Sequence, residues 1–276
     1  VVDQQRWSFD LSMTWDLLWR SVTHGIVPGL VGGPWDWQRW APASPWATPV
    51  VITLAVISVV AGALNKNGQT DMMRLIAFTS ISHFGFIVLG IFALTSVGGA
   101  GSTLYMVNHG FSTAGLFLLA GFLVARRGSK RIPDYGGWQR VTPVLAGSFL
   151  VVGLSSLALP GLSSFVSEFL VLQGTFMNYP WAAVIAALGI VLAALYILLM
   201  YQRVMTGPKP SFADGEAPPD LSWREKVVVM PIIASFLFLG FFPKPVLDLV
   251  NPAVDRTLQI VGVSDPAPAN ASGSEK

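Results

Sequence analysis

Three ionisable side chains lie within long apolar stretches of this sequence, which makes them candidates for chemistry. Glu168, in "LALPGLSSFVSEFL", is the only one of the fifteen Asp and Glu residues inside a run long enough to cross a membrane. His83 and His109, two of the three histidines, also fall inside such runs. Ionisable groups at membrane depth are costly and indicate a functional site facing a bundle interior or a hydrated path. For each histidine a purely structural role is the alternative, since a neutral imidazole needs only one hydrogen bond.

The charge state of Glu168 determines what chemistry these groups could do. Burial strongly disfavours a carboxylate, whereas the positive end of a helix contributes only about 0.3–1 kcal/mol. Glu168 must therefore be neutral, hydrated or paired with a cation. No Lys or Arg lies inside the predicted spans, so within this chain only the two histidines could supply positive charge. A carboxyl poised between these states, with protonatable imidazoles on adjacent helices, predicts stepwise proton transfer.

The Pro160-Gly161 pair predicts a break in the helix that carries Glu168. Proline cannot donate to the carbonyl four residues earlier, and glycine lets the chain turn. Within a membrane such a break is tolerated only where protein or a wet cavity satisfies the freed backbone groups. We expect Ser163 and Ser164 to cap the second half-helix, with Glu168 just beyond its first turn. A proline kink made for packing is the alternative.

The composition places these residues in an all-α, polytopic membrane protein. The 276 residues are 53% hydrophobic and only 12% charged, whereas soluble domains carry about 25% charged residues. A spanning helix needs about 20 mostly apolar residues. The sequence predicts about six transmembrane helices, one of them discontinuous at Pro160-Gly161: 46–64, 75–94, 104–124, 141–172, 181–200 and 227–242. A capping box from Ser222 to Glu225 is expected to start the last of these early.

Several other functions find no support in the sequence. There is no cysteine, which excludes disulfides, thiolate metal sites and cysteine nucleophiles. A net charge of +2 does not suggest nucleic-acid binding. No nucleotide-binding loop, zinc-protease motif or catalytic triad is present, and two lone histidines on separate helices make a weak case for haem or another metal. We therefore expect no metal or cofactor site in this chain.

The basic residues alternate from one predicted connection to the next. Eleven Lys and Arg lie in or beside the connections after the first, third and fifth spans, and the two connections between them hold none. Because cytoplasmic loops are enriched in Lys and Arg, both ends of the chain are predicted to lie on the extracytoplasmic side.

The two ends differ in composition from the membrane domain predicted at 47–244. Residues 1–46 hold seven of the ten tryptophans and a candidate amphipathic helix, which predicts either an interfacial helix or a helix docked in a larger assembly. Residues 245–276 are expected to form an extracytoplasmic tail, disordered in its Pro-rich final part. Because the sequence does not begin with Met, it is expected to start partway into a longer protein.

Four stretches, in order and correctly spaced, resemble a known family: "GQTDMMRLIAFTSISHFGFIVLGI", "VNHGFSTAGLFLLAG", "LALPGLSSFVSEFLVLQGTF" and "FLGFFPKPVLD". They are similar to the antiporter-like M subunits of bacterial NADH–quinone oxidoreductase (complex I), the counterparts of mitochondrial subunit 4. The resemblance covers residues from about 47 to 250. It implies the second of two inverted five-helix repeats, with its discontinuous helix at Pro160-Gly161, plus the last span of the family.

The resemblance also implies roles for individual residues. Glu168 matches the acid of the broken helix, at the distal end of a proton half-channel, and His83 and His109 match histidines of the central hydrophilic axis. The related L and N subunits usually have Lys in place of this Glu. The family implies the lipid bilayer and the other membrane subunits of complex I, especially L and N, as partners, and no nucleic acid. NADH, FMN, iron–sulfur clusters and quinone are then expected in other subunits, and a bacterial inner membrane as the location.

Three functional hypotheses follow. The chain could be a truncated or C-terminal part of subunit M that translocates protons while other subunits oxidise NADH and reduce quinone. It could instead be a half-length paralogue that packs in a membrane assembly without conducting. A third possibility is a subunit of a related cation/proton antiporter or membrane-bound hydrogenase complex.

Overall fold

A computed structural model describes residues 47–64, 69–212 and 216–266 of the chain. The interfacial segment predicted at 1–46 and the last ten residues of the predicted tail lie outside these ranges. The described residues form helices without a strand, which confirms the all-α class. The helices are α2 (Ala47–Leu64), α3 (Met72–Phe92), α4 (Ser96–Arg127), η2 (Ile132–Asp134), η3 (Trp138–Arg140), α5 (Pro143–Ser156), α6 (Ser163–Asn178), α7 (Pro180–Met205), α8 (Trp223–Phe241) and α9 (Lys244–Val261).

All six predicted apolar runs coincide with helices, but fewer of them qualify as membrane spans. Helices α2, α3, α4 and α7 are long and apolar enough to cross a membrane individually. Helices α8 and α9 qualify only together, as a pair bent by 71°. In the described part of the chain this gives four or five spans by length and composition. The remaining predicted span is the discontinuous helix, whose halves α5 and α6 have 14 and 16 residues and are each too short to be counted alone. The prediction of about six helices, one of them broken, is therefore confirmed.

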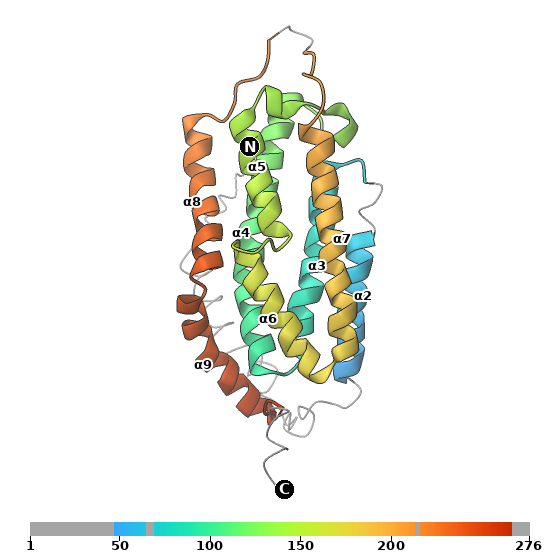
Figure 1. Cartoon of the computed structure of the whole chain (residues 1–276), viewed down its shortest axis with the longest axis vertical. Coiled ribbons are helices and arrows are strands. Elements are labelled where there is room, and N and C mark those ends of the chain that lie inside the picture. The colour runs from blue at the N-terminus through green and yellow to red at the C-terminus, as the bar shows by residue number, and fades with distance from the viewer. Residues whose placement is uncertain (1–46, 65–68, 213–215, 267–276) are drawn as a thin grey trace, which may run out of the picture. The chain divides into compact units, whose positions relative to one another are not determined.

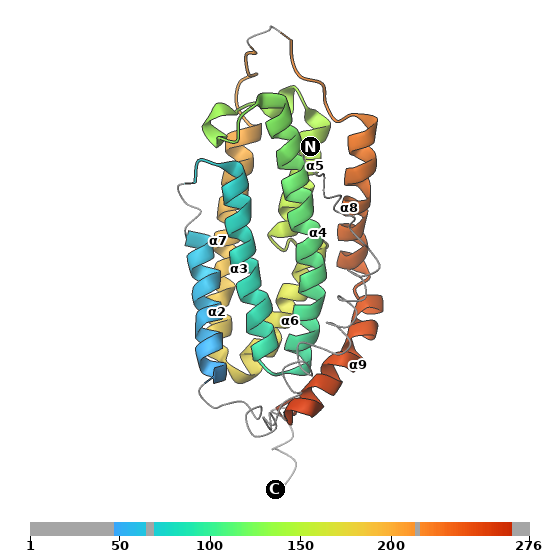
Figure 2. The same cartoon turned by 180° about the vertical axis from the view of Figure 1, so that it is seen from behind.

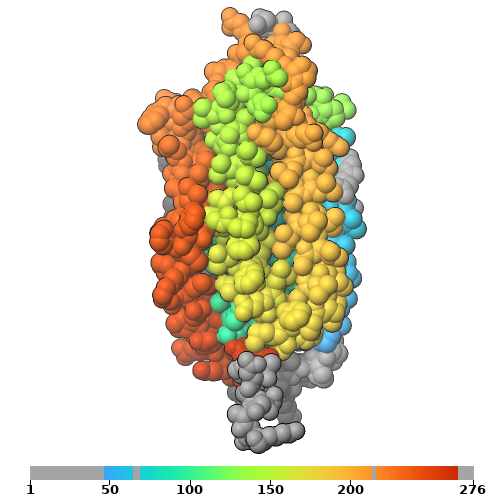
Figure 3. All heavy atoms as spheres, viewed as in Figure 1, coloured from blue at the N-terminus to red at the C-terminus, as the bar shows by residue number. Residues whose placement is uncertain are grey.

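The helices of this membrane domain pack in two layers (Figures 1 and 2). Helices α3 and α4 lie side by side in one layer, and α4 contacts α5 and α6 in the other, where α6 also contacts α7. Figure 3 shows α5 and α6 forming the face between α8–α9 and α7. Helix α2 packs on α3 and α7. Residues placed between the layers by α3, α4 and α6 therefore meet in the interior of the bundle.

Local sequence signals explain where several helices begin and end. The carboxylate of Asp71 accepts a hydrogen bond of 2.9 Å from the backbone of the first turn of α3, and Thr95 caps α4 in the same way. Gly128, with a φ of 75°, ends α4 in the left-handed conformation that glycine adopts without strain. The capping box of Ser222 and Glu225 is present at the start of α8, as the sequence predicted.

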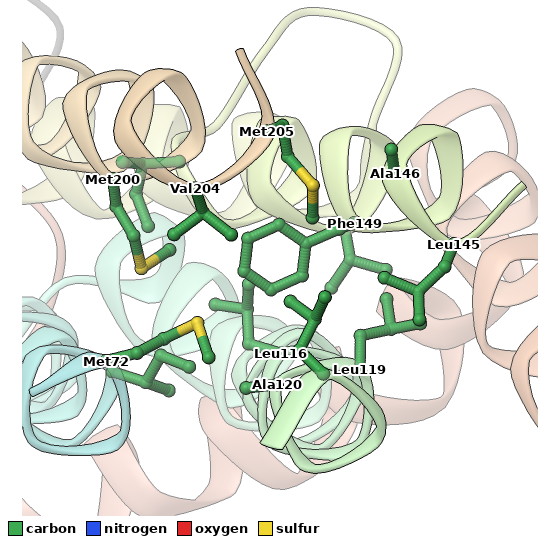
Figure 4. Close-up of a cluster of buried hydrophobic side chains, with 14 of the residues drawn as sticks. Met72, Leu116, Leu119, Ala120, Leu145, Ala146, Phe149, Met200, Val204 and Met205 are labelled. Atoms are coloured by element: carbon green, nitrogen blue, oxygen red, sulfur yellow. The ribbon is translucent and has the colours of Figure 1, made fainter. Parts of the chain in front are cut away.

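A cluster of buried apolar side chains holds α3, α4, α5 and α7 together (Figure 4). Phe149 of α5 lies in the middle of the view, with Val204 and Met205 of α7 on one side and Leu116 of α4 on the other. All four side chains are buried. Because lipid tails are as apolar as these side chains, the cluster stabilises the bundle through close packing rather than through removal from water. It fixes the position of α4 against the broken helix.

The basic connections gather at one end of the bundle. The segment after α4 pairs with the start of α3, since the N–H of Met72 donates to the carbonyl of Lys130 at 2.9 Å. The same segment contacts the connection after α7, where the guanidinium of Arg140 donates to the carbonyl of Gly207 at 2.9 Å. The alternating charge pattern thus corresponds to one basic end of the domain.

Helix α9 was missed by the sequence analysis, which assigned residues 245–276 to a tail. Its half-buried residues recur at helical spacing, with Val246, Val250, Val254 and Leu258 on one face. That face packs against α4. Beyond α9 the carboxylate of Asp265 accepts a hydrogen bond of 2.8 Å from the first backbone N–H of α4. The segment was missed because its short apolar stripe is interrupted by prolines, which ordinarily argue against a helix interior.

Candidate functional site

The predicted break in the membrane helix is present, but it begins before the Pro-Gly pair. Helix α5 ends at Ser156 and α6 starts at Ser163, so Pro160 and Gly161 lie within a non-helical connection. Ala158 has a φ of 54° and Gly161 a φ of 90°. Both values lie in the left-handed region, which costs energy for alanine and little for glycine. The chain has therefore already left the helix two residues before Pro160.

The expected serine caps are not formed. The residue that caps α6 is Leu162, which has no side-chain capping bond, and Ser163 and Ser164 are buried inside the first turn of the helix. Ser163 instead approaches the other half of the broken helix, with its hydroxyl 3.2 Å from that of Ser155. The serines thus connect the two half-helices rather than terminate one of them.

Neighbouring helices hold the break in place. The side-chain amide of Asn108, from α4, donates to the backbone carbonyl of Ser163 at 2.7 Å and to the hydroxyl of Ser167 at 3.1 Å. On the other side α8 comes into backbone contact, because a Cβ atom on Gly240 would lie 2.4 Å from the carbonyl oxygen of Gly161. Protein groups therefore satisfy and enclose the irregular backbone, as a break at membrane depth requires.

Glu168 lies in the interior, one and a half turns into α6. Glu168 is 4% exposed, and its carboxylate oxygen Oε1 accepts a hydrogen bond from the hydroxyl of Tyr105 on α4. Tyr105 is fully buried and packs edge-on against Phe86 of α3, with ring centroids 6.3 Å apart. A carboxyl placed between helices in this way faces protein and not lipid.

The two histidines form a direct pair. The Nδ1 atoms of His83, on α3, and His109, on α4, are 3.1 Å apart, and their rings meet edge to face. In a hydrogen bond between two Nδ1 atoms, one nitrogen must donate and the other must accept. If both imidazoles were doubly protonated, two N–H groups would face each other. The pair can therefore carry one extra proton at a time, which suits the stepwise transfer predicted from the sequence.

Tyr105 connects the acid to the histidine pair. Its ring centroid is 5.8 Å from that of His83 and 6.4 Å from that of His109. We call Glu168, Tyr105, His83 and His109 the buried tetrad. The sequence analysis singled out the acid and both histidines, and the structure brings these three together. It missed Tyr105, although the spacing of four residues from His109 places both on one face of α4.

The surroundings of the buried tetrad are polar but weakly charged. Thr113 places its hydroxyl 3.2 Å from Nδ1 of His109, and Tyr196 of α7 is close enough to Glu168 to interact with it electrostatically. The ion pairs found among the described residues are Arg126–Glu225 and Lys244–Asp248, neither of which involves Glu168. The same part of the chain holds no group of three or more His, Asp and Glu side chains that could ligate a metal. Carboxyl, phenol and imidazole side chains are groups that can exchange protons.

The helical membrane bundle, with a buried acid on a broken helix, fits the resemblance to antiporter-like membrane subunits. Comparison with known families supports this resemblance, because residues 38–194 match the family described as "NADH:quinone oxidoreductase/Mrp antiporter, TM". The chain is also 56% identical over 235 residues to the NADH-quinone oxidoreductase subunit M of Mycobacterium tuberculosis, covering 85% of this chain and 42% of that protein. The chain therefore belongs to this family, which confirms the resemblance inferred from its motifs.

Solved structures support the same assignment. A chain of the respiratory complex I from Thermus thermophilus, solved with bound NADH, superimposes with a TM-score of 0.74 at 31% identity. The match covers 78% of this chain and 45% of that one. A chain of the Mrp complex from Dietzia matches with a TM-score of 0.70 at 20% identity, covering 78% of this chain and 49% of that one, which shows a shared fold. The chain thus spans less than half the length of these relatives.

Proposed function

We propose that this chain is the C-terminal part of an M subunit of NADH–quinone oxidoreductase and that it takes part in proton translocation. The high identity to a subunit M over most of the chain supports the assignment to that complex. In this proposal other subunits oxidise NADH and reduce quinone, and they hold the NADH, FMN, iron–sulfur and quinone sites. This chain performs no redox chemistry of its own.

The observation that carries the proposal is the buried tetrad. The carboxyl of Glu168, the phenol of Tyr105 and the paired imidazoles of His83 and His109 are proton-exchanging groups in one buried cluster. Each could accept a proton from one neighbour and release it to another. The broken helix places Glu168 beside irregular backbone, where polar groups that can hold water are tolerated at membrane depth.

The proposal also covers the partners, the location and the orientation of the chain. The homology to complex I and the shared fold with the Mrp complex support membrane-arm partners, among which we propose the antiporter-like L and N subunits. The location is the inner membrane of a bacterium. Because basic loops face the cytoplasm, the basic end of the domain is assigned to that side, and both termini to the extracytoplasmic side.

Replacing the buried acid tests the function. We expect Glu168→Gln, introduced into the full-length subunit of the intact complex, to slow the proton-transfer step by about 10²–10⁴-fold, the usual contribution of an acid–base group. The measurement is NADH-driven acidification of vesicles containing the purified complex, normalised to the amount of assembled complex. Glu216→Gln is the matched control, because Glu216 is exposed in the connection before α8. Unimpaired proton transport in an assembled Glu168→Gln complex would falsify the proposal.

One alternative within the transport class has a specific observation in its favour. The family includes Mrp antiporters, and the Dietzia Mrp chain has the same fold. The neighbouring genes distinguish the two: genes for NADH-oxidising and quinone-binding subunits support complex I, and genes for other antiporter subunits support the alternative. A reading frame directly upstream of this gene that encodes the first repeat would argue against a non-conducting half-length paralogue.

A further inference from the structure

The hydroxyl of Tyr105 donates directly to the carboxyl oxygen Oε1 of Glu168. Both residues are buried, Tyr105 completely and Glu168 to all but 4%. A proton that reaches this oxygen from the side of α4 must therefore pass the phenol or displace it.

The ring of Tyr105 also lies beside the histidine pair. Tyr105 and His109 are four residues apart on α4, so they share a face and are about 6 Å apart along the helix axis. The ring centroids of His83 and His109 lie 5.8 and 6.4 Å from that of Tyr105. The side chain thus contacts the acid with its hydroxyl and the imidazoles with its ring, from a single position in the bundle.

Apolar packing fixes the position of the ring. Tyr105 belongs to a buried cluster that includes Ile52 of α2, Phe86 of α3 and Val171 of α6. Close packing of this kind restricts a side chain to one arrangement. The hydroxyl is therefore held at Glu168 by the surroundings of the ring, and its oxygen retains lone pairs that can accept another proton.

We propose that the Tyr105 hydroxyl relays protons between the histidine pair and Glu168, an inference that rests on the proton-translocating function proposed above. The O–H proton of Tyr105 moves to the ionised carboxylate of Glu168. The phenolic oxygen takes a proton from the imidazolium of the histidine pair through one water molecule. One O–H bond breaks and one forms at the phenol, which ends unchanged. The net result is transfer of one proton from a histidine to Glu168, with no electron transferred.

Tyr105→Phe tests the relay because it removes the hydroxyl and keeps the ring that packs. The variant is made in the full-length subunit of the intact complex, and NADH-driven acidification of vesicles is measured in H₂O and in D₂O. We expect normal assembly, at least about a tenfold loss of proton transport through this subunit and a larger solvent isotope effect, because proton transfer becomes rate-limiting. Tyr201→Phe is the matched control, since Tyr201 is a partly buried tyrosine of α7 in the other apolar cluster. It should behave as the unmodified complex.

The outcomes separate the relay from the function on which it rests. If Tyr105→Phe transports protons at the normal rate with an unchanged isotope effect, while Glu168→Gln is impaired, the relay is wrong and the proposed function stands. If Glu168→Gln is also unimpaired, the proposed function itself fails.

A second measurement needs no change at Tyr105. In complexes with ring-deuterated tyrosine, Glu168→Gln replaces the acceptor of the phenol, so a tyrosine C–O stretching band should shift in the infrared spectrum. An unchanged band would show that the phenol and the acid do not interact, and would overturn the relay even if Tyr105→Phe failed to assemble.

Discussion

Gly174→Ala probes the close crossing of α4 and α6, the two helices that carry Tyr105 and Glu168. A Cβ atom on Gly174 would lie 2.3 Å from the backbone nitrogen of Gly98 and 2.6 Å from the hydroxyl oxygen of Thr95. Real Cβ contacts are almost never shorter than 3.0 Å. The obstacles include backbone atoms, which cannot rotate away, so the two helices must move apart by roughly 1 Å to restore van der Waals contact.

The destabilisation caused by this clash can be isolated by comparison with an alanine substitution at a second glycine. Overpacking of this kind costs about 1–3 kcal/mol, and replacing a glycine by alanine in a helix returns about 0.5–1 kcal/mol. Gly121→Ala, on α4, gains the same helix propensity without a clash, since a Cβ atom there meets nothing within 4 Å. The difference between the two variants is therefore the overpacking term alone. We expect Gly174→Ala to be less stable than Gly121→Ala by about 1–3 kcal/mol.

The assay is reversible unfolding of the full-length subunit in mixed detergent micelles, followed by helical circular dichroism, with proton transport measured in the assembled complex. Gly174→Ala should also lower transport, because separating α4 from α6 lengthens the hydrogen bond between Tyr105 and Glu168. Equal stability of the two alanine variants would refute the backbone contact between these helices.

Two further predictions concern regions outside the buried tetrad. Arg126→Met should destabilise the domain by about 1.5–3 kcal/mol in the same unfolding assay. The Arg126 side chain is only 11% exposed and donates to both carboxylate oxygens of Glu225, at 2.9 and 2.7 Å. Lys244→Met is the control and should have little effect, because the Lys244 side chain, which pairs with Asp248, is 81% exposed. Burial raises the pKa of Tyr135 from about 10 to about 12, against the opposing charge of Arg127. The stabilisation from this raised pKa is complete below pH 10 and is lost as the pH rises through 12. Absorbance titration should show a tyrosine that ionises only near pH 12, and this component should be missing in Tyr135→Phe. If the titration of that variant is unchanged, the raised pKa does not belong to Tyr135.

The helices themselves could be predicted from local sequence. Long apolar runs, the capping box of Ser222 and Glu225, and the Pro160-Gly161 pair are short-range signals, and each acts through neighbouring residues of the same element. Their approximate positions are confirmed. The exact start of the break was not predictable, because the irregular backbone after α5 is held by residues of other helices: Asn108 contacts Ser163, and Gly240 closely approaches Gly161.

The sequence revealed three of the four residues of the buried tetrad, but not the contacts between them. An acid in an apolar run stands out because burying its charge is costly, so Glu168 could be found without knowing its neighbours. Tyr105 could not, since a tyrosine in an apolar helix is compatible with ordinary core packing and carries no charge to reveal it. The contact between His83 and His109 was equally hidden, because their separation of 26 residues specifies no geometry.

The sequence by itself determined the membrane class, the helical elements and the one acid that must be accommodated, because periodicity and hydropathy are properties of a single segment. Only the tertiary structure decided what that acid touches. Contacts between helices depend on the depth and rotation at which each helix packs, and those are set by close approaches such as Gly98 against Gly174, which no single segment encodes.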